Sequence, residues 1–156
     1  MAEADQTLII ERLPEPPTWS DLEAFAALDR EAFAADGLTA ANLRLLALTG
    51  RLYVARLEGQ VTGQAVVLGR LDGPGAFLLG LAVGQAWRGR QMGRRLLQFI
   101  LADLARAGVP FLELTVDPAN LPAVSLYEKE GFVRERLVPD LLGPGKARLI
   151  MRRSLS

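Results

Sequence analysis

Hydrophobic residues change their spacing several times along the chain, and each spacing predicts a different kind of element. Helices are expected where hydrophobic residues recur at helical spacing, over residues 22–33, 40–48, 92–104 and 121–130. Strands are expected over the short apolar or alternating runs 8–10, 51–57, 61–68, 76–83, 111–116, 132–137 and 147–152. This order of strands and helices is typical of an α/β sheet protein.

Local signals set the expected boundaries of several elements. Ser20 with Glu23 forms a capping-box pattern, which predicts the start of the first helix. The Gly-containing residues 58–60 join two strand-like runs as a hairpin. Residues 76–83 are apolar throughout, which predicts a central strand buried on both faces. A Pro- and Gly-containing loop over 139–145 separates the last two strands.

Composition removes several functional classes. The chain has 156 residues, 50% of them hydrophobic, which predicts a single domain over 1–156 with a core of its own. It has no His and no Cys, which excludes disulfides, zinc-finger and iron–sulfur sites, His-based acid–base catalysis and thiol nucleophiles. No metal site is expected. Its 18 Lys and Arg balance 18 Asp and Glu, which argues against a nucleic-acid partner.

The chain shows no sequence signal for export or for membrane insertion. Residues 1–10 carry acids and no basic, apolar leader, so a secretory signal is not expected. No apolar run approaches the roughly 20 residues that a membrane-spanning helix requires. A cytoplasmic protein with no membrane partner is therefore the expectation.

Arginines cluster between the expected central strand and the helix that follows it. Arg88, Arg90, Arg94 and Arg95 fall within eight positions, and no acidic residue occurs over 73–102. A helix start favours anions through its free amides and its dipole, and arginines add charge-assisted contacts. A phosphate or pyrophosphate ligand is the functional interpretation. The alternative is a glycine-containing turn followed by a solvated helix face, and the segment matches neither the dinucleotide- nor the ATP-binding glycine motif.

Two segments of the chain are similar to the motifs of one known family. Arg88-Gly89-Arg90-Gln91-Met92-Gly93 is similar to the pyrophosphate loop Gln/Arg-x-x-Gly-x-Gly/Ala, except that Gln91 replaces the first fixed glycine. Asn120, Ala123 and residues 126–132 are similar to Asn-x-x-Ala-x-x-Leu-Tyr-x-x-x-Gly-Phe. Both motifs belong to the GNAT superfamily of acetyl-CoA-dependent N-acetyltransferases. The resemblance implies a GNAT-like mixed central sheet of about six to seven strands, with helices on both faces and splayed central strands.

The resemblance also implies where acetyl-CoA, the co-substrate, binds. The backbones of Leu81 and Val83 would bind pantetheine and orient the acetyl carbonyl, and amides from Gly89 to Arg94 would hold the pyrophosphate. If glycine in the motif serves a positive φ, Gln91 either strains the turn or keeps it at negative φ. The expected cofactor-binding residues are Leu81, Ala82, Val83, Arg88, Gly89, Arg90, Gln91, Met92, Gly93, Arg94 and Asn120.

Tyr127 is the candidate catalytic acid. Acetyl transfer from a thioester to an amine needs a neutral amine, a polarised carbonyl and protonation of the departing thiolate. By resemblance the Tyr127 hydroxyl faces the thioester sulfur; alternatively the ring packs its helix against the sheet. Asn120 has a structural explanation as the N-cap before Leu121, and in the family the same residue also touches the cofactor arm. Without Cys or His, direct attack in a ternary complex is expected.

The catalytic base is less well defined by the sequence. Many family members carry a glutamate on the fourth strand, but residues 77–83 contain no ionisable group. In ribosomal-protein N-terminal acetyltransferases the base glutamate lies at the position of Thr115, which counts against that subclass here. Glu113 lies two residues earlier on the same strand face and is the candidate base. A solvated strand-end carboxylate and a water chain are the alternatives.

The acceptor is expected to be a primary amine, either a small molecule or a peptide terminus. Its specificity is expected in the N-terminal helices and the loop over 139–145. Acidic residues of the first helical segment suit either attraction of a cationic amine or an exposed helix face; they are Asp21, Glu23, Asp29, Glu31 and Asp36.

Other functions remain open at the level of sequence. A non-catalytic acyl-CoA-binding or regulatory module is the second hypothesis, because Gln91 departs from the motif and the strand-four glutamate is absent. An RNA-binding surface at the arginines is a third, against which the lack of interleaved aromatic residues beyond Trp87 argues. A homodimer through the C-terminal strands is compatible with the family resemblance.

Overall fold

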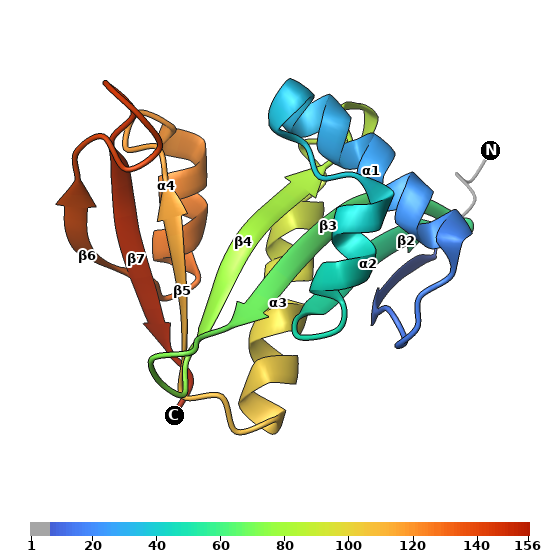
Figure 1. Cartoon of the computed structure of the whole chain (residues 1–156), viewed down its shortest axis with the longest axis horizontal. Helices are drawn as coiled ribbons and strands as arrows, with labels where there is room; N and C mark the ends of the chain where they lie inside the picture. The colour runs from blue at the N-terminus through green and yellow to red at the C-terminus, as the bar shows by residue number, and fades with distance from the viewer. Residues whose placement is uncertain (1–6) are drawn as a thin grey trace. The chain divides into compact units, whose positions relative to one another are not determined.

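The computed structural model describes residues 7–156, and its elements follow the order expected from the sequence (Figure 1). Residues 1–6, part of the segment in which no secretory signal is expected, lie outside the described residues. The elements are β1 (Leu8–Arg12), α1 (Trp19–Phe33), the 3₁₀ turn η1 (Ala34–Asp36), α2 (Ala40–Leu46), β2 (Arg51–Leu57), β3 (Gln60–Gly69), β4 (Ala76–Val83), the 3₁₀ turn η2 (Gln85–Trp87), α3 (Met92–Arg106), β5 (Phe111–Val116), α4 (Leu121–Lys129), β6 (Val133–Val138) and β7 (Arg148–Ser154).

The chain divides into two compact units that share β4 and α3. Described residues up to Leu68 form the first unit together with Gly80–Ile100. Gly69–Leu79 and Leu101–Ser156 form the second. The seven strands pair in the order β1-β2-β3-β4-β5-β7-β6, so the strands of the first unit end at β4 and those of the second begin there.

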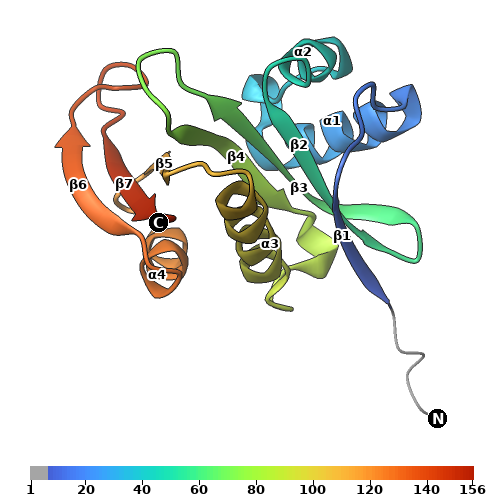
Figure 2. The ribbon, with the colours of Figure 1, turned by 90° about the horizontal axis from the view of Figure 1, so that it is seen from below.

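Helices cover both faces of the sheet in the first unit, with α1 and α2 on one side and α3 on the other (Figure 2). Alternate residues of β2 explain this arrangement, because successive side chains of a strand point to opposite faces. Leu52 and Val54 belong to the buried cluster that includes Leu22 of α1. Tyr53, between them, meets Phe99 of α3 edge-on, with ring centroids 6.1 Å apart.

The start of α1 differs from the expected one. Thr18 is the N-cap, and its Oγ1 accepts a hydrogen bond from the Asp21 amide at 3.1 Å. The capping box predicted at Ser20 and Glu23 is therefore wrong by two residues. Prolines at the two preceding positions favour an extended backbone up to Thr18, so the chain turns helical directly after it. A reciprocal capping box does occur at the start of α2, between Thr39 and Asn42.

A buried carboxylate ties α1 to its following connection. Asp29 is 4% exposed, which corrects the expectation that it lies on an open helix face. Its Oδ2 accepts from the Leu38 amide at 2.6 Å, and its Oδ1 accepts from Nε2 of Gln64 on β3 at 2.5 Å. Gln64 is fully buried, and its Oε1 has no hydrogen-bond partner among the described residues. Asp29 thus fixes the α1–α2 connection onto the sheet.

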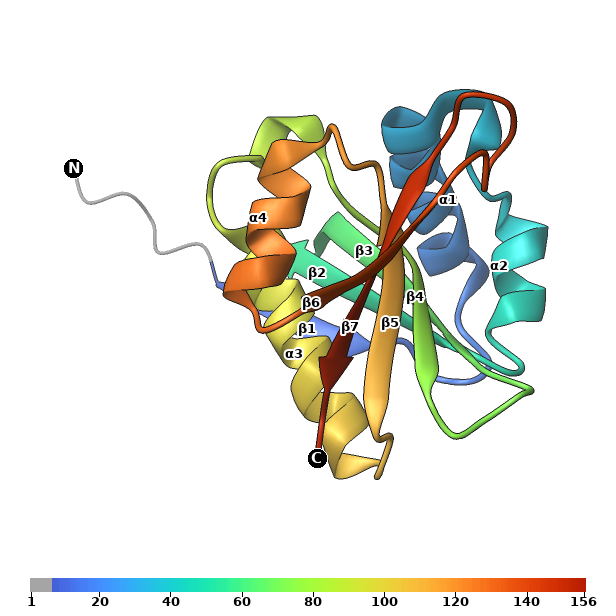
Figure 3. The same ribbon diagram turned by 90° about the vertical axis from the view of Figure 1, so that its left-hand side faces the viewer.

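In the second unit, β5 lies between the first half of β4 and β7, and β6 is the outer strand. The β4–β5 pair is parallel, and the β5–β7 and β7–β6 pairs are antiparallel. Helix α4 runs along one face of these strands (Figure 3). The buried side chains on that face include Leu112, Leu114 and Met151. The expected fold class, an α/β protein with a mixed central sheet of about six to seven strands, is confirmed.

Strand β4 is less buried than its sequence predicts. Leu78 and Ala82 are buried, but Leu79 is 44% exposed, and its same-face neighbours Leu81 and Val83 are only half-buried. The expectation that β4 is buried on both faces is therefore wrong. The parallel ladder to β5 also stops at Leu78, although β4 continues to Val83. The uniform apolar run thus marks a strand that the protein covers only in part.

Candidate functional site

The last residues of β4 present two peptide groups away from β3. The Gly84 amide donates to the Thr62 carbonyl of β3 at 2.8 Å. Because peptide directions alternate along a strand, Ala82 also turns toward β3, whereas Leu81 and Val83 turn toward the opposite edge. No strand ladder of the described residues pairs Leu81 or Val83 on that edge. These are the two residues whose backbones are expected to bind pantetheine.

The connection from β4 to α3 is held in place by its own contacts. Glu31 of α1 accepts from the Gln85 amide at 2.5 Å, and the Trp87 amide donates to the Gly84 carbonyl at 2.9 Å. A Cβ on Gly84 would lie 2.8 Å from the Trp87 ring, so only glycine allows this close packing. Arg88 folds back and donates from Nε to the Val83 carbonyl at 3.3 Å. The loop is therefore fixed relative to the end of β4.

Two residues just before α3 adopt left-handed backbone conformations. Gly89 has a φ of 81° and Gln91 a φ of 57°, so glutamine keeps the positive φ that a glycine would adopt there. The Arg95 amide donates to the Gln91 carbonyl at 3.0 Å. The amides of Met92 and Gly93 precede it and have no carbonyl one turn earlier in the helix. Left-handed residues next to such amides form the concave donor sets that bind anions.

This loop also concentrates positive charge. No acidic residue lies between Asp72 and Asp103, and Arg88, Arg90 and Arg95 form no ion pair with any residue of the described part of the chain. Some arginines elsewhere are neutralised; Arg56, for example, pairs with both Glu11 and Asp21. The residues expected to hold the pyrophosphate therefore lie together in one segment of the first unit. The Met92 side chain is buried, and its sulfur accepts from the Thr62 hydroxyl, so only the backbone of Met92 is expected to contact a ligand.

We expect Gln91→Gly to raise the free energy of unfolding by about 1 kcal/mol, because glycine adopts positive φ without the Cβ strain of glutamine. Urea denaturation monitored by circular dichroism measures this change. Arg90→Gly is the matched control: its φ is not positive, so added chain entropy should lower stability by about 0.5–1 kcal/mol. An equal loss of unfolding free energy in Gln91→Gly and Arg90→Gly would contradict the strain at Gln91.

Asn120 and Tyr127 both belong to α4 in the second unit. Asn120 is the N-cap, and its Oδ1 accepts from the Ala123 amide at 3.3 Å, as the structural explanation of this residue predicts. Tyr127 lies two turns later, and its ring packs edge-on against Phe132 with centroids 5.6 Å apart. Burial raises the pKa of Tyr127, and the positive charge of Arg148 opposes this rise. The phenol is therefore protonated at neutral pH.

Glu113 occupies an ion-pair cluster on β5. Its Oε1 accepts from Arg70 at 3.0 Å and its Oε2 from Arg152 at 2.9 Å. Cross-strand pairing places Glu113 on the sheet face of Arg152, whereas Arg134, on the opposite face, pairs with Glu128 of α4. The structure therefore brings Glu113 together with arginines and separates it from the face that carries Tyr127. The alternative interpretation of Glu113 as a solvated carboxylate at a strand end is wrong, because its side chain is only 12% exposed.

Sequence reasoning missed the contacts of Arg148. Its Nε donates to the Thr115 hydroxyl at 3.3 Å and its Nη2 to the Thr115 carbonyl at 3.1 Å. The Arg148 guanidinium thus lies beside Thr115, the position at which the resemblance to ribosomal-protein N-terminal acetyltransferases would place a base glutamate. The sequence did carry one signal for these contacts: alternation along the last strand puts Arg148, Ile150 and Arg152 on one face of the sheet.

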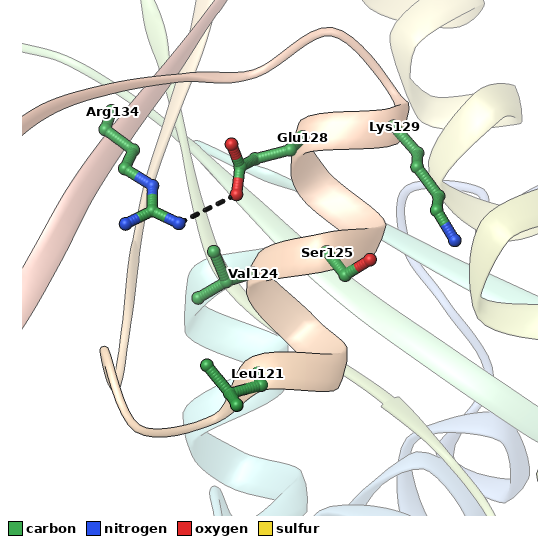
Figure 4. Close-up of a pocket in the computed structure, with 6 residues that line it drawn as sticks. All are labelled: Leu121, Val124, Ser125, Glu128, Lys129 and Arg134. Atoms are coloured by element: carbon green, nitrogen blue, oxygen red, sulfur yellow. Dashed lines mark hydrogen bonds and ion pairs between the residues drawn. The ribbon is translucent and has the colours of Figure 1, made fainter.

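A hollow of about 470 Å³ lies between α4 and Arg134 of β6 and contains none of the predicted site residues (Figure 4). Its rim carries the ion pair between Glu128 and Arg134, 2.9 Å apart. The lining residues are Leu121, Val124, Ser125, Glu128, Lys129 and Arg134.

Comparison with known proteins identifies the family. The model of the acetyltransferase (GNAT) family matches residues 8–132. The chain therefore belongs to the GNAT family. This GNAT protein is 38% identical over 122 residues to the N-alpha-acetyltransferase RimI of Mycobacterium tuberculosis, covering 75% of each chain.

Solved structures agree with this membership at the level of the fold. The ribosomal-protein-S18-alanine N-acetyltransferase of Escherichia coli superposes with a TM-score of 0.81 at 23% identity, covering 96% of this chain and 95% of that one. The NatC complex bound to Gag peptide and CoA gives a TM-score of 0.78 at 16% identity, covering 96% of this chain and 99% of that one.

Two further observations concern membranes and metals. No helix within residues 7–156 has both the length and the apolar character needed to cross a membrane. The same residues contain no group of three or more carboxylates arranged to hold a metal ion.

Proposed function

We propose that this GNAT protein transfers the acetyl group of acetyl-CoA to a primary amine. The loop before α3 carries this proposal, because it joins left-handed residues at Gly89 and Gln91 to arginines with no carboxylate nearby in sequence. Such a loop suits a pyrophosphate, which is doubly charged and accepts several hydrogen bonds. Outward peptide groups of Leu81 and Val83 suit the amides of a pantetheine arm.

The reaction proceeds by direct attack in a ternary complex. The nitrogen of the neutral amine bonds to the thioester carbonyl carbon, and the C–S bond breaks as the tetrahedral intermediate collapses. The amine loses one proton to a base or to water, and the departing thiolate gains one from the Tyr127 hydroxyl. The phenolate is then reprotonated from solvent. With no Cys and no His in the chain, neither residue type can carry the acetyl group.

The similarity to RimI favours a peptide or protein terminus as the acceptor. Ribosomal-protein N-terminal acetyltransferases carry their base glutamate at the position of Thr115, which has no carboxylate. The acceptor and the base of this protein therefore need not be those of ribosomal-protein enzymes. A primary amine is the class that both observations support.

Glu113 stays the predicted base, and its surroundings support a structural role as well. If it is the base, Glu113→Gln should lower the acetylation rate most at low pH, because fewer acceptor amines are neutral there and proton removal limits the rate. Initial rates across the pH range measure this. Glu135→Gln is the matched control, since Glu135 also pairs with Arg152, at 3.3 Å, and should leave the pH profile unchanged. An unchanged profile for Glu113→Gln would reject the base role.

Calorimetric titration with acetyl-CoA, followed by a free-thiol release assay over a panel of amines, tests the proposed function. Micromolar binding and amine-dependent thiol release are the expected results. Failure to bind acetyl-CoA would overturn the proposal. Binding without turnover on any amine would favour the non-catalytic acyl-CoA-binding module.

Two further expectations concern the molecule in the cell. We infer a cytoplasmic location, which fits both the sequence and the bacterial RimI relative.

A homodimer through the C-terminal strands stays a prediction. The outer strand β6 exposes Val133 and Leu137, which a second copy would cover. Sedimentation velocity tests this expectation.

A further inference from the structure

A polar hollow of about 410 Å³ lies in the second unit, between the turn after β5 and the connection from β6 to β7. Like the hollow on α4, it has three charged side chains in its lining, but neither of its two cations forms an ion pair with a described residue, whereas Arg134 on α4's hollow pairs with Glu128. Its lining residues are Asp117, Pro118, Leu142, Gly145, Lys146, Ala147 and Arg148.

Positive charge prevails in this hollow. Lys146 is exposed and forms no ion pair with any residue in 7–156. Arg148 donates from Nε and Nη2 to uncharged oxygens of Thr115, so its charge is not neutralised and its Nη1 is left to donate. Asp117 is the only carboxylate of the lining, and its Oδ1 already accepts from the Ala119 amide at 2.9 Å.

The same face of the sheet extends this positive surface. Cross-strand pairing aligns Thr115, Ile150 and Arg136 in one row on that face. Arg136 is exposed and has no ion-pair partner within the described part of the chain. The nearest acid in the connection, Asp140, accepts from the Gly145 amide at 2.7 Å and so turns toward its own loop.

Arg148 also connects the hollow to the reaction. Its charge acts on Tyr127, the proposed acid. Arg148 is held to Thr115 by two hydrogen bonds, so its guanidinium is fixed beside β5. A ligand group bound at Arg148 is therefore within electrostatic reach of the phenol that would protonate the thiolate.

We propose that Lys146 and Arg148 bind a carboxylate of the acceptor, so that this enzyme prefers primary amines that also carry a carboxylate. The inference rests on the proposed function and specifies its substrate class. An arginine presents N–H donors in a plane that matches a carboxylate, and a lysine adds a second charge. Two sources supply this chemistry: the α-carboxylate of a free amino acid, and an acidic side chain near a peptide terminus.

Matched acceptor pairs test the proposal on the full-length protein. One arm compares a free amino acid with its amide, and the other compares peptides with Glu or Gln as the second residue. We expect the carboxylate form to have a kcat/KM about tenfold higher in at least one arm, with the preference falling as salt rises. The arm that shows the preference identifies the source.

Substitutions locate the preference in the hollow. Lys146→Gln should reduce the ratio of carboxylate to amide kcat/KM about threefold, and Arg148→Gln should abolish it, while Arg148→Lys retains part. Lys129→Gln is the matched control, since Lys129 is the only other lysine and lies on α4 outside this hollow. The ratio cancels any effect of a substitution that both acceptors share, such as a change in the folded fraction or in acetyl-CoA binding.

The outcomes separate this inference from the proposed function. Equal kcat/KM for both members of both pairs, or an unchanged ratio in Lys146→Gln and Arg148→Gln, would overturn the carboxylate site while leaving acetyl transfer intact. Absence of acetyl-CoA binding would overturn the proposed function first. Acetyl-CoA binding with neither member of any pair acetylated would also overturn the carboxylate preference.

Discussion

Replacing Tyr127 by phenylalanine is expected to lower kcat by about 100-fold while leaving the dissociation constant of acetyl-CoA within about twofold. The ring that packs on Phe132 remains, so the change removes only the hydroxyl that would protonate the thiolate. Because burial raises the pKa of Tyr127 above its ordinary value of 10.0, the wild-type phenol stays protonated through neutral pH. The midpoint of any activity loss from ionisation of this group should therefore lie above pH 10.

The chain offers a matched control for this substitution. Tyr53 is the only other tyrosine, is fully buried and packs against Phe99 in the first unit. Tyr53→Phe should cost about 1 kcal/mol of stability and leave kcat unchanged. Thiol release gives kcat, and calorimetry gives the acetyl-CoA affinity. Unchanged turnover in Tyr127→Phe would assign Tyr127 to packing alone.

Replacing Asp29 by alanine is expected to lower the free energy of unfolding by about 3 kcal/mol. The change removes the acceptor for the Leu38 amide and for the Gln64 side chain, and Gln64 is fully buried. Both donors would then lack partners inside the protein, which costs more than the loss of an exposed hydrogen bond. Chemical denaturation measures the change.

Asp36→Ala is the control for the Asp29 substitution. Asp36 belongs to the same connection, in η1, but is exposed, so its removal should change stability by no more than about 0.5 kcal/mol. Asp29→Asn should have an intermediate effect, because one amide oxygen can still accept while the NH₂ group faces a second donor. A loss for Asp29→Ala as small as that of Asp36→Ala would contradict the anchoring role.

Periodicity predicted the element order because it depends on neighbours in the sequence. The helix α3, for example, buries Leu96, Leu97, Ile100 and Leu104, which recur at helical spacing. Exact helix starts were harder, because Ser20 satisfies the capping pattern as well as Thr18 does. The choice between them depends on the prolines before Thr18, which act on backbone conformation and leave the periodic pattern unchanged.

The sequence predicted those parts of the candidate site whose residues are neighbours along the chain. It did not predict contacts between residues that only the fold brings together. Gly89 and the arginines of the α3 loop are contiguous in sequence, so their common chemistry could be inferred without a structure. The contact of Arg148 with Thr115 and that of Glu113 with Arg70 join residues 33 and 43 positions apart. Strand alternation indicates which face a side chain occupies, but it does not identify the partner across the sheet.

The outward peptide groups of Leu81 and Val83 have a consequence for the handling of the protein. A strand edge without a ladder can pair with any extended chain that reaches it, including that of another molecule. An acyl-CoA arm along β4 would occupy these groups and would also stabilise the folded chain by mass action. We therefore expect ligand-free protein to self-associate on storage sooner than protein saturated with acetyl-CoA, so that co-substrate supply would govern its colloidal stability.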